Sequence, residues 1–232
     1  MRTLSRTHID RLGDRFRKDE ISEDDLRLLD DYRQSFTDAY QEVVGLVRTF
    51  GLNATGRPLK TTSSIVDKLN RESIRLSQVQ DIAGCRMIVA NLNQQDEVTN
   101  NITAAFEKTT VFDRRDRPSH DYRAVHIVAR LRGKAVEVQL RTPLQHAWAE
   151  LSEKLSDVFD PAIKYGGGSE EVRRLLRNSS ALAAQIERTE REIMAGQHAP
   201  AALGIGSEAE FFEQKQQFMN MLEEFAEYWR NA

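Results

Sequence analysis

Residues 136–141, Val-Glu-Val-Gln-Leu-Arg, alternate apolar and polar side chains, and this alternation constrains the fold more than any other stretch. A period of two is that of a β-strand, so Glu137, Gln139 and Arg141 share one face while three apolar residues share the other. Such a strand is typical of a half-exposed sheet or of a cleft that the polar face lines. The alternation alone favours the half-exposed sheet, so the rest of the chain has to decide.

A second alternating run, from Arg123 to Leu131, precedes a turn at Gly133 and predicts a hairpin with the first strand. The apolar run 85–90 predicts a buried strand, whereas the charged residues 111–121 predict an exposed loop. Apolar residues at three-and-four spacing, capping residues and stop signals predict helices over 24–50, 64–76, 93–108, 144–159, 169–194 and 208–229. A few strands flanked by helices indicate an α/β (α+β) fold.

The composition is that of a soluble globular protein. Hydrophobic residues make up 40% and charged residues 30% of the 232 residues. No apolar run approaches the ~18 residues of a membrane span, and the N-terminus lacks the apolar core of a signal peptide, so we expect a cytoplasmic protein with no membrane contact. Cys85 is the only cysteine, which excludes an internal disulfide and indicates a small buried side chain.

Net charge gives no global signature of nucleic-acid binding, because it is only −3. Residues 1–18 are locally basic and predict either a basic N-terminal arm, over 1–22, or a solvated helical face. The cations are Arg2, Arg6, Arg11, Arg15, Arg17 and Lys18, against Asp10 and Asp14.

Cations and hydroxyl groups gather in residues 57–68, where a loop leads into a helix. Ser64 and Lys68 are four residues apart and share a helical face, while the free N–H groups of the helix start favour an anion. The segment suits a triphosphate, although a capped helix with surface lysines explains it about as well. It lacks the Gly-x-x-x-x-Gly-Lys spacing of a Walker loop.

Two carboxylates and two ring-bearing residues complete the chemistry. Asp81 precedes the buried strand; together with Glu137 from a neighbouring strand it could form the two-carboxylate oxygen site that Mg²⁺ prefers. Tyr122 and His126 lie on one face of the incoming strand, where a ring could stack on a nucleobase and an imidazole could bond a ribose or phosphate. Each residue alone fits an ordinary structural role.

Five ordered motifs resemble the synthetase domain of RelA/SpoT proteins over roughly residues 25–165. The motifs are Arg57 to Lys68, Asp81 to Arg86, Tyr122 to His126, Val136 to Thr142 and Gln145 to Glu150. The resemblance implies a nucleotidyltransferase-like mixed β-sheet flanked by helices, with N- and C-terminal helical extensions. It also implies transfer of the β,γ-pyrophosphate of ATP to a ribose 3′-hydroxyl. The compact length resembles small stand-alone alarmone synthetases, including the toxin branch that modifies the 3′ adenosine of tRNA.

The resemblance implies a role for each matching residue and a division into an arm (1–22), a synthetase domain (23–165) and a helical extension (166–232). Asp81 and Glu137 would bind Mg²⁺, and Glu137 could instead help to deprotonate the attacking hydroxyl. The ATP contacts would be Arg57, Lys60, Ser64, Lys68 and Arg86. The acceptor contacts would be Tyr122, His126, Gln139, Arg141, Arg114 and Arg115.

The chain departs from the family pattern in three places. Asp121 replaces the glycine that usually precedes the tyrosine; it takes up positive φ less easily and adds negative charge. Arg57 stands one residue further from Lys60 than the corresponding arginine does in typical family members, because Pro58 is inserted between them. The lysine pair that typically holds a guanosine nucleotide is replaced by arginines, namely Arg114, Arg115 and Arg117.

The missing lysine pair and the basic N-terminal arm favour the tRNA 3′-CCA end as acceptor, which would make the protein a translation-inhibiting toxin restrained by an antitoxin. The alternatives are synthesis of (p)ppGpp from GDP or GTP, an adenosine nucleotide acceptor, and an inactive nucleotide-binding module. The metal-binding His and Asp residues of a hydrolase domain are missing from the pattern. The last helix is more apolar than one face needs, so it either packs on the core or meets a partner such as an antitoxin or a second subunit.

Overall fold

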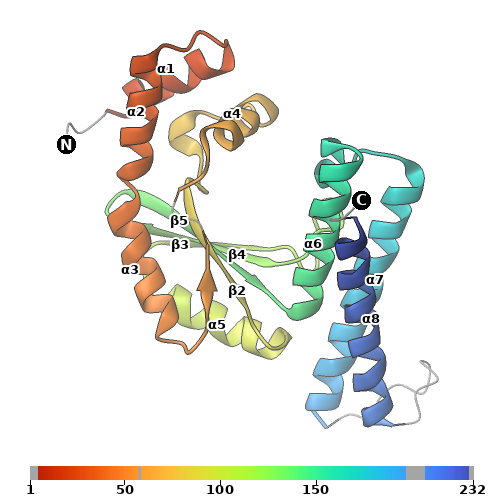
Figure 1. Cartoon of the computed structure of the whole chain (residues 1–232). Helices are drawn as coiled ribbons and strands as arrows, with labels where there is room; N and C mark the ends of the chain where they lie inside the picture. The colour runs from red at the N-terminus through yellow and green to blue at the C-terminus, as the bar shows by residue number, and fades with distance from the viewer. Residues whose placement is uncertain (1–4, 57–58, 197–206, 230–232) are drawn as a thin grey trace. The chain divides into compact units, whose positions relative to one another are not determined.

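The structure, a computed structural model, describes residues 5–56, 59–196 and 207–229 (Figure 1). The chain forms two compact units. The first consists of Met1–Met87, Ile102–Val111 and Ile127–Gln139. The second consists of Ile88–Asn101, Phe112–His126 and Leu140–Ala232.

Helices and strands alternate along the middle of the chain, and helices alone occupy both ends. The helices are α1 (Arg6–Arg17), α2 (Glu23–Gln34), α3 (Thr37–Arg48), α4 (Thr62–Arg71), α5 (Leu92–Ala105), α6 (Pro143–Val158), α7 (Glu170–Met194) and α8 (Glu208–Tyr228), with short 3₁₀ turns η1 (Leu76–Gln78) and η2 (Pro161–Tyr165). The strands are β1 (Ala54–Thr55), β2 (Ala83–Ile88), β3 (Thr109–Asp113), β4 (Val125–Leu131) and β5 (Lys134–Arg141).

The strands form one sheet in the order β1-β2-β5-β4-β3, with β1 antiparallel to β2. The predicted fold class, a sheet flanked by helices at both ends of the chain, is confirmed. The predicted loop over 111–121 is wrong at its start, because Thr109–Asp113 is the edge strand β3. Its side chains stay largely exposed there, which is why the composition resembles that of a loop.

The predicted hairpin is formed by β4 and β5. Arg132 (φ 53°) and Gly133 (φ 75°) connect them and both take positive φ, as a two-residue turn between twisted strands requires. The interiors of both strands are mostly buried, and Lys134, Glu137 and Gln139 are the half-buried positions of β5. The alternation in the sequence therefore marks a strand of the central sheet.

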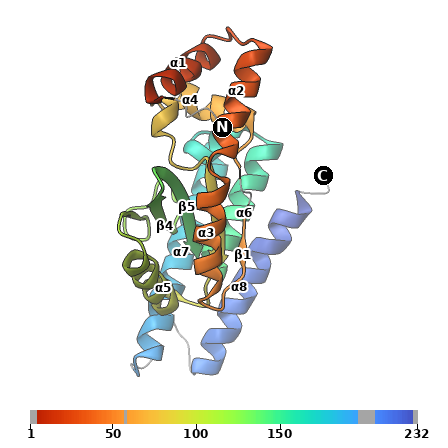
Figure 2. The ribbon, with the colours of Figure 1, turned by 90° about the vertical axis from the view of Figure 1, so that its left-hand side faces the viewer.

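In the first unit, the N-terminal segment is helix α1, which buries Ile9, Leu12 and Phe16. Figure 2 shows α1 beside α2 and α4. Gly13 permits the close approach of η1, since a Cβ at that position would lie 2.8 Å from the Cβ of Leu76. The described part of the predicted basic arm is thus a packed helix.

The single helix predicted over 24–50 is two helices, because α2 ends at Gln34 and α3 begins at Thr37. Ser22 caps α2 in a reciprocal capping box with Asp25. Arg15 of α1 donates to Oδ1 of Asp25 from Nη2 at 2.5 Å and from Nε at 3.0 Å, and these bonds fix α1 against α2. Periodicity could not show the break, since both helices keep one apolar face.

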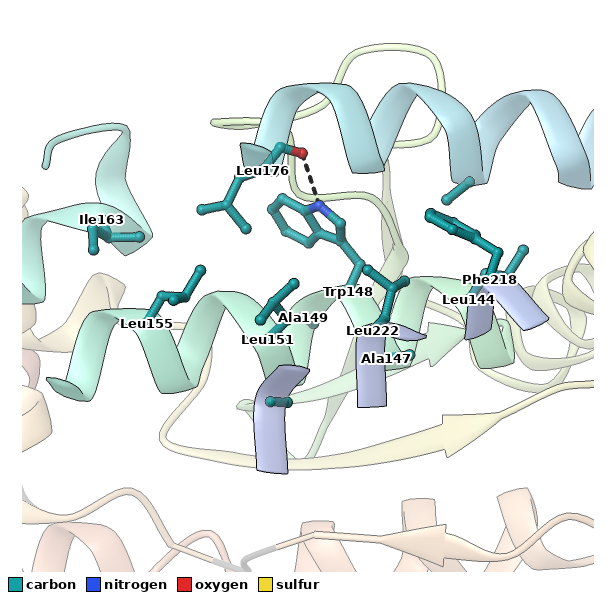
Figure 3. Close-up of a cluster of buried hydrophobic side chains, with 12 residues drawn as sticks. Leu144, Ala147, Trp148, Ala149, Leu151, Leu155, Ile163, Leu176, Phe218 and Leu222 are labelled. Carbon is teal, nitrogen blue, oxygen red and sulfur yellow. Dashed lines mark hydrogen bonds between the residues drawn. The ribbon is translucent and has the colours of Figure 1, made fainter. Parts of the chain in front are cut away.

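In the second unit, α6, α7 and α8 lie side by side (Figures 1 and 2). Trp148 stands at the centre of their apolar cluster, and its indole N–H donates to the carbonyl oxygen of Leu176 at 2.9 Å (Figure 3). Helix α8 adds Phe218 and Leu222 to the cluster, so the last helix packs on the core of its unit. No helix in the described part of the chain has both the length and the apolar character to cross a membrane.

Candidate active site

A lysine pair surrounds one carboxylate in the first unit. The ammonium of Lys60 lies 2.8 Å from Oδ2 of Asp81, and the ammonium of Lys68 lies 3.0 Å from Oδ1. Burial opposes ionisation of Asp81, but the two lysines outweigh it and hold its pKa below the ordinary value. The cluster is a charged, partly desolvated site with one net positive charge.

Local structure places each member of this cluster. The backbone N–H of Lys60 donates to the carbonyl of Ile82 at 2.7 Å, which holds the loop before α4 beside the segment that enters β2. Thr61 caps α4 by accepting from the N–H of Ser64, so this helix begins two residues before the predicted start at 64. Lys68 is on the same helix and reaches Asp81 from there.

Glu137 and Gln139 border the same site from β5. They line a small cavity of about 90 Å³ together with Lys60, Asp81, Ile82 and Gly84. The amide of Gln139 donates to Oε2 of Glu137 at 2.8 Å, so the polar face of the strand is ordered before any ligand arrives. The cavity brings together two carboxylates, a lysine and an amide.

Gly84 allows this approach between β2 and β5. A Cβ there would lie 2.8 Å from the carbonyl oxygen of Glu137, too close for any side chain. Sequence reasoning treated this glycine only as part of a motif. A glycine inside an apolar strand is itself a signal of close backbone approach, and it could have identified the position.

The two carboxylates can supply oxygen ligands to a hard cation. Mg²⁺ is commonly bound by one or two carboxylates while substrate phosphates and water complete its shell, and Asp81 and Glu137 fit that donor set. Among the described residues, no group of three or more His, Cys, Asp or Glu side chains is placed to hold a metal by itself. A cation here would therefore depend on its substrate for further ligands.

The other predicted ATP contacts fall near this cluster in the sequence. Ser64 accepts a hydrogen bond from the hydroxyl of Thr61 at 2.8 Å. Arg86 is on β2 in register with Thr55 of β1. Arg57 lies outside the described residues.

In the second unit, Tyr122, His126 and Arg141 form one cluster. The Tyr122 hydroxyl lies 2.8 Å from Nε2 of His126 and accepts from Nε of Arg141 at 3.2 Å. The Arg141 guanidinium also lies over the tyrosine ring, 5.1 Å from its centroid. Arg141 is only 3% exposed, and its Nη1 has no hydrogen-bond partner among the described residues. The cluster presents an aromatic ring, an imidazole and a buried cation with donor capacity to spare.

The two predicted acceptor arginines differ in their surroundings. Arg115 donates to Asp113 at 2.5 Å and to Asp96 at 2.6 Å, so its guanidinium is already occupied by carboxylates. Arg114 donates its backbone N–H to Ala124 at 2.9 Å, and its side-chain Nε is buried without a partner among the described residues. Among the described residues, carboxylates therefore occupy the guanidinium of Arg115 and none pairs with Arg114.

One family matches the chain over residues 56–156, the region found in RelA and SpoT proteins. The chain carries a RelA/SpoT region. Every predicted site residue, from Arg57 to Arg141, lies within that match. The sheet and the two clusters described above are thus the folded form of a RelA/SpoT region.

Relatives and solved structures extend the comparison beyond this region. Uncharacterized proteins of Mycobacterium tuberculosis and Mycobacterium bovis are 35% identical over 117 residues, which is 49% of this chain. The match spans 43% of the length of those relatives. Small alarmone synthetase 1 of Bacillus subtilis matches with a TM-score of 0.55 and 26% identity, covering 75% of this chain and 98% of the synthetase. A Streptococcus mutans protein matches with a TM-score of 0.54 and 25% identity, covering 72% of this chain and 94% of the Streptococcus mutans chain.

Proposed function

We propose that this chain is an ATP-dependent pyrophosphokinase that transfers the β,γ-pyrophosphate of ATP to a ribose 3′-hydroxyl. The observation that carries the proposal is the Lys60–Asp81–Lys68 cluster, which shares a cavity with Glu137 inside a RelA/SpoT region. Two cations and two carboxylates are the groups that bind a magnesium polyphosphate. Similarity to small alarmone synthetases supports the same reaction class.

In this proposal the ammonium groups of Lys60 and Lys68 leave the Asp81 carboxylate and bind the phosphates of ATP when ATP arrives. Their ammonium groups are point charges that can move from a carboxylate to a phosphate oxygen. Asp81 is then free to bind Mg²⁺ together with Glu137. The metal would supply charge neutralisation at the phosphate oxygens. Because the pKa of Asp81 is held low, its carboxylate is ionised and ready to bind the cation at neutral pH.

The transfer step needs in-line positioning more than covalent help. The 3′-oxygen forms a bond to the β-phosphorus, the bond from that phosphorus to the α,β-bridging oxygen breaks, and AMP leaves. In the alternative in which Glu137 acts as the base and not as a metal ligand, it takes the proton from the attacking hydroxyl, and Gln139 orients that carboxylate through its 2.8 Å hydrogen bond. Tyr122, His126 and Arg141 bind the acceptor.

Two acceptors are supported by different observations. The missing lysine pair favours the tRNA 3′ end, which would make the chain a toxin controlled by an antitoxin. The similarity to a small alarmone synthetase favours a guanosine nucleotide. The N-terminal cations now support tRNA less well, since Arg15 is paired with Asp25 and Arg17 donates to the carbonyl of Leu69.

A transfer assay with ATP labelled in its terminal phosphate tests the reaction. With magnesium present, we expect label to move to GDP, GTP or tRNA. Asp81→Asn and Glu137→Gln should each lower kcat by about a hundredfold or more, as loss of an electrostatic or acid–base group does. Asp157→Asn, which alters an exposed carboxylate on α6, should leave the rate unchanged.

The same assay separates the alternatives. No transfer to any acceptor would overturn the proposal, and ATP binding without turnover would instead indicate a binding module. Transfer to tRNA should weaken steeply between 50 and 200 mM salt because phosphate contacts release counterions, whereas transfer to a free nucleotide should weaken much less.

A further inference from the structure

The first unit contains a second cavity, distinct from the one beside Asp81. Its volume is about 640 Å³, within the range of roughly 300–1,000 Å³ typical of small-molecule sites. Residues of α1, α2 and η1 line it together with the β4–β5 turn. None of its lining residues lines the smaller cavity that holds Lys60 and Glu137.

The described charged residues that line this cavity all carry positive charge. Arg6, Arg130 and Lys134 line it, and none of the described residues that line it carries a carboxylate. The nearby carboxylate, Asp10, is engaged elsewhere: it accepts from the N–H of Ser77 at 3.1 Å and lies 4.0 Å from Arg75. The cavity therefore concentrates positive potential with no anion in its lining.

Lys134 lines the cavity and is held in place by neighbouring side chains. Its ammonium lies 4.6 Å from the ring centroid of Phe36 and 5.1 Å from that of Tyr32, and it donates to the hydroxyl of Ser35 at 2.6 Å. Burial lowers the pKa of Lys134, so its charge is desolvated, and no carboxylate in the described part of the chain pairs with it. An anion bound beside Lys134 would offset the desolvation of its ammonium group, and the rings of Tyr32 and Phe36 would limit the directions from which that anion can approach.

Other lining residues add hydrogen-bonding groups. Nε of Arg6 donates to the hydroxyl of Ser77 at 3.2 Å, which orients the guanidinium and leaves its remaining N–H groups for a ligand. The side chain of Gln80 also lines the cavity and carries an amide donor and acceptor. Guanidinium forks and an ammonium facing one hollow are the usual means of binding phosphate oxygens.

We propose that this cavity binds a phosphate-bearing small molecule at a site separate from the Lys60–Asp81–Lys68 cluster. The concave shape favours a small ligand over an extended polymer backbone. Three cations match a group that carries two or more negative charges. This proposal does not rest on the pyrophosphokinase reaction, because none of its residues belongs to the proposed catalytic groups.

Calorimetric titration with inorganic tripolyphosphate tests the site. The protein carries Lys60→Gln and Lys68→Gln, so that the proposed catalytic cluster no longer contributes. We expect binding of one tripolyphosphate per chain. Adding Arg130→Gln with Lys134→Met, which keeps most of the apolar stem over the rings, should weaken that binding about tenfold or more. Arg6→Gln, an exposed position, serves as a second variant should Lys134→Met fail to fold.

Arg132→Gln is the matched control. Arg132 stands in the same turn and carries the same charge, but it pairs with Glu42 at 2.9 Å and does not line this cavity. Its replacement should leave the affinity within about twofold of the parent. Absence of binding in the parent, unchanged affinity in the cavity variants, or an equal loss in Arg132→Gln would each overturn the proposal. Titration with a nucleoside triphosphate distinguishes a bound nucleotide, which should bind more tightly, from recognition of the phosphates alone.

Discussion

At the scale of single residues, the turn before Tyr122 is the most unusual feature of the second unit. Ser119 and Tyr122 pair across it, and the two residues between them both have positive φ, His120 at 52° and Asp121 at 66°. Turns of this kind normally place glycine or asparagine there, because a Cβ is strained in the left-handed region. The sequence departure at Asp121 is therefore also a point of backbone strain, directly before Tyr122 of the Tyr122–His126–Arg141 cluster.

We predict that Asp121→Gly stabilises the protein by about 1 kcal/mol. Glycine removes the cost of holding a residue with a Cβ in the left-handed region, and the greater flexibility that glycine gives the unfolded chain offsets part of that gain. Urea unfolding measures the change. If the strain also limits the position of Tyr122, the same variant should transfer pyrophosphate faster than the parent.

Asp116→Gly is the matched control for that prediction. Asp116 lies in the same loop, is exposed and bears the same charge, and both aspartates act on Arg123 at a distance, but it does not take up positive φ. It should leave stability unchanged or lower it slightly. Equal stabilisation by both variants would attribute the effect to charge and not to backbone strain.

At the scale of elements, helix α1 depends on one close contact. Gly13 faces η1, where the space for a Cβ is filled by Leu76, and both residues are buried. Glycine weakens a helix interior by roughly 1 kcal/mol relative to alanine, so its presence here serves the packing of α1 on η1 and not the helix itself.

We predict that Gly13→Ala lowers the free energy of unfolding by about 1–3 kcal/mol, the usual cost of overpacking, despite the better helix propensity of alanine. Gly45→Ala is the comparison, because Gly45 is an exposed position in α3 with no atom within 4 Å of its added Cβ. That variant should gain up to about 1 kcal/mol. Thermal and urea unfolding of the pair would contradict the packing account if both changes had the same sign.

At the scale of the whole molecule, the pH dependence of stability should reflect a buried carboxylate of the second unit. Glu187 on α7 accepts from the hydroxyl of Thr142 and from the amide of Gln145 at 3.1 Å, the two residues of the α6 capping box. Burial raises the pKa of Glu187, although both hydrogen bonds oppose that shift. The pKa of Glu187 is therefore higher in the folded than in the unfolded protein. Glu187 contributes most to the free energy of unfolding at low pH, where it is protonated, and this contribution is lost as pH rises.

We predict that Glu187→Gln becomes progressively more stable than the parent as pH rises from 4 to 8, because the amide cannot ionise. Urea unfolding across this range measures the difference. Glu192→Gln, at an exposed position on the same helix, reports the effect of the charge change alone. A difference for Glu187→Gln that does not vary with pH would contradict the burial argument.

Sequence patterns predicted the elements that repeat a local period. The strand at Glu137, the hairpin at Gly133 and the long helices α6, α7 and α8 appear where alternation or helical periodicity places them, to within a few residues. The break between α2 and α3 and the exposed strand β3 were missed. Both depend on burial and pairing with distant segments, which leave no periodic trace in a single sequence.

By itself the sequence determined which chemical groups the site would contain, because ordered motifs preserve residue types and spacing. Only the tertiary structure decided how they combine. Lys60 and Lys68 both form ion pairs with Asp81, and the Arg141 guanidinium lies over the Tyr122 ring. Arg115 forms ion pairs with Asp113 and Asp96. The cavity around Lys134 had no sequence signal, since its cations come from separate elements of the first unit. Spacing along the chain fixes the face on which a side chain lies, whereas its partners depend on which distant segments fold against that face.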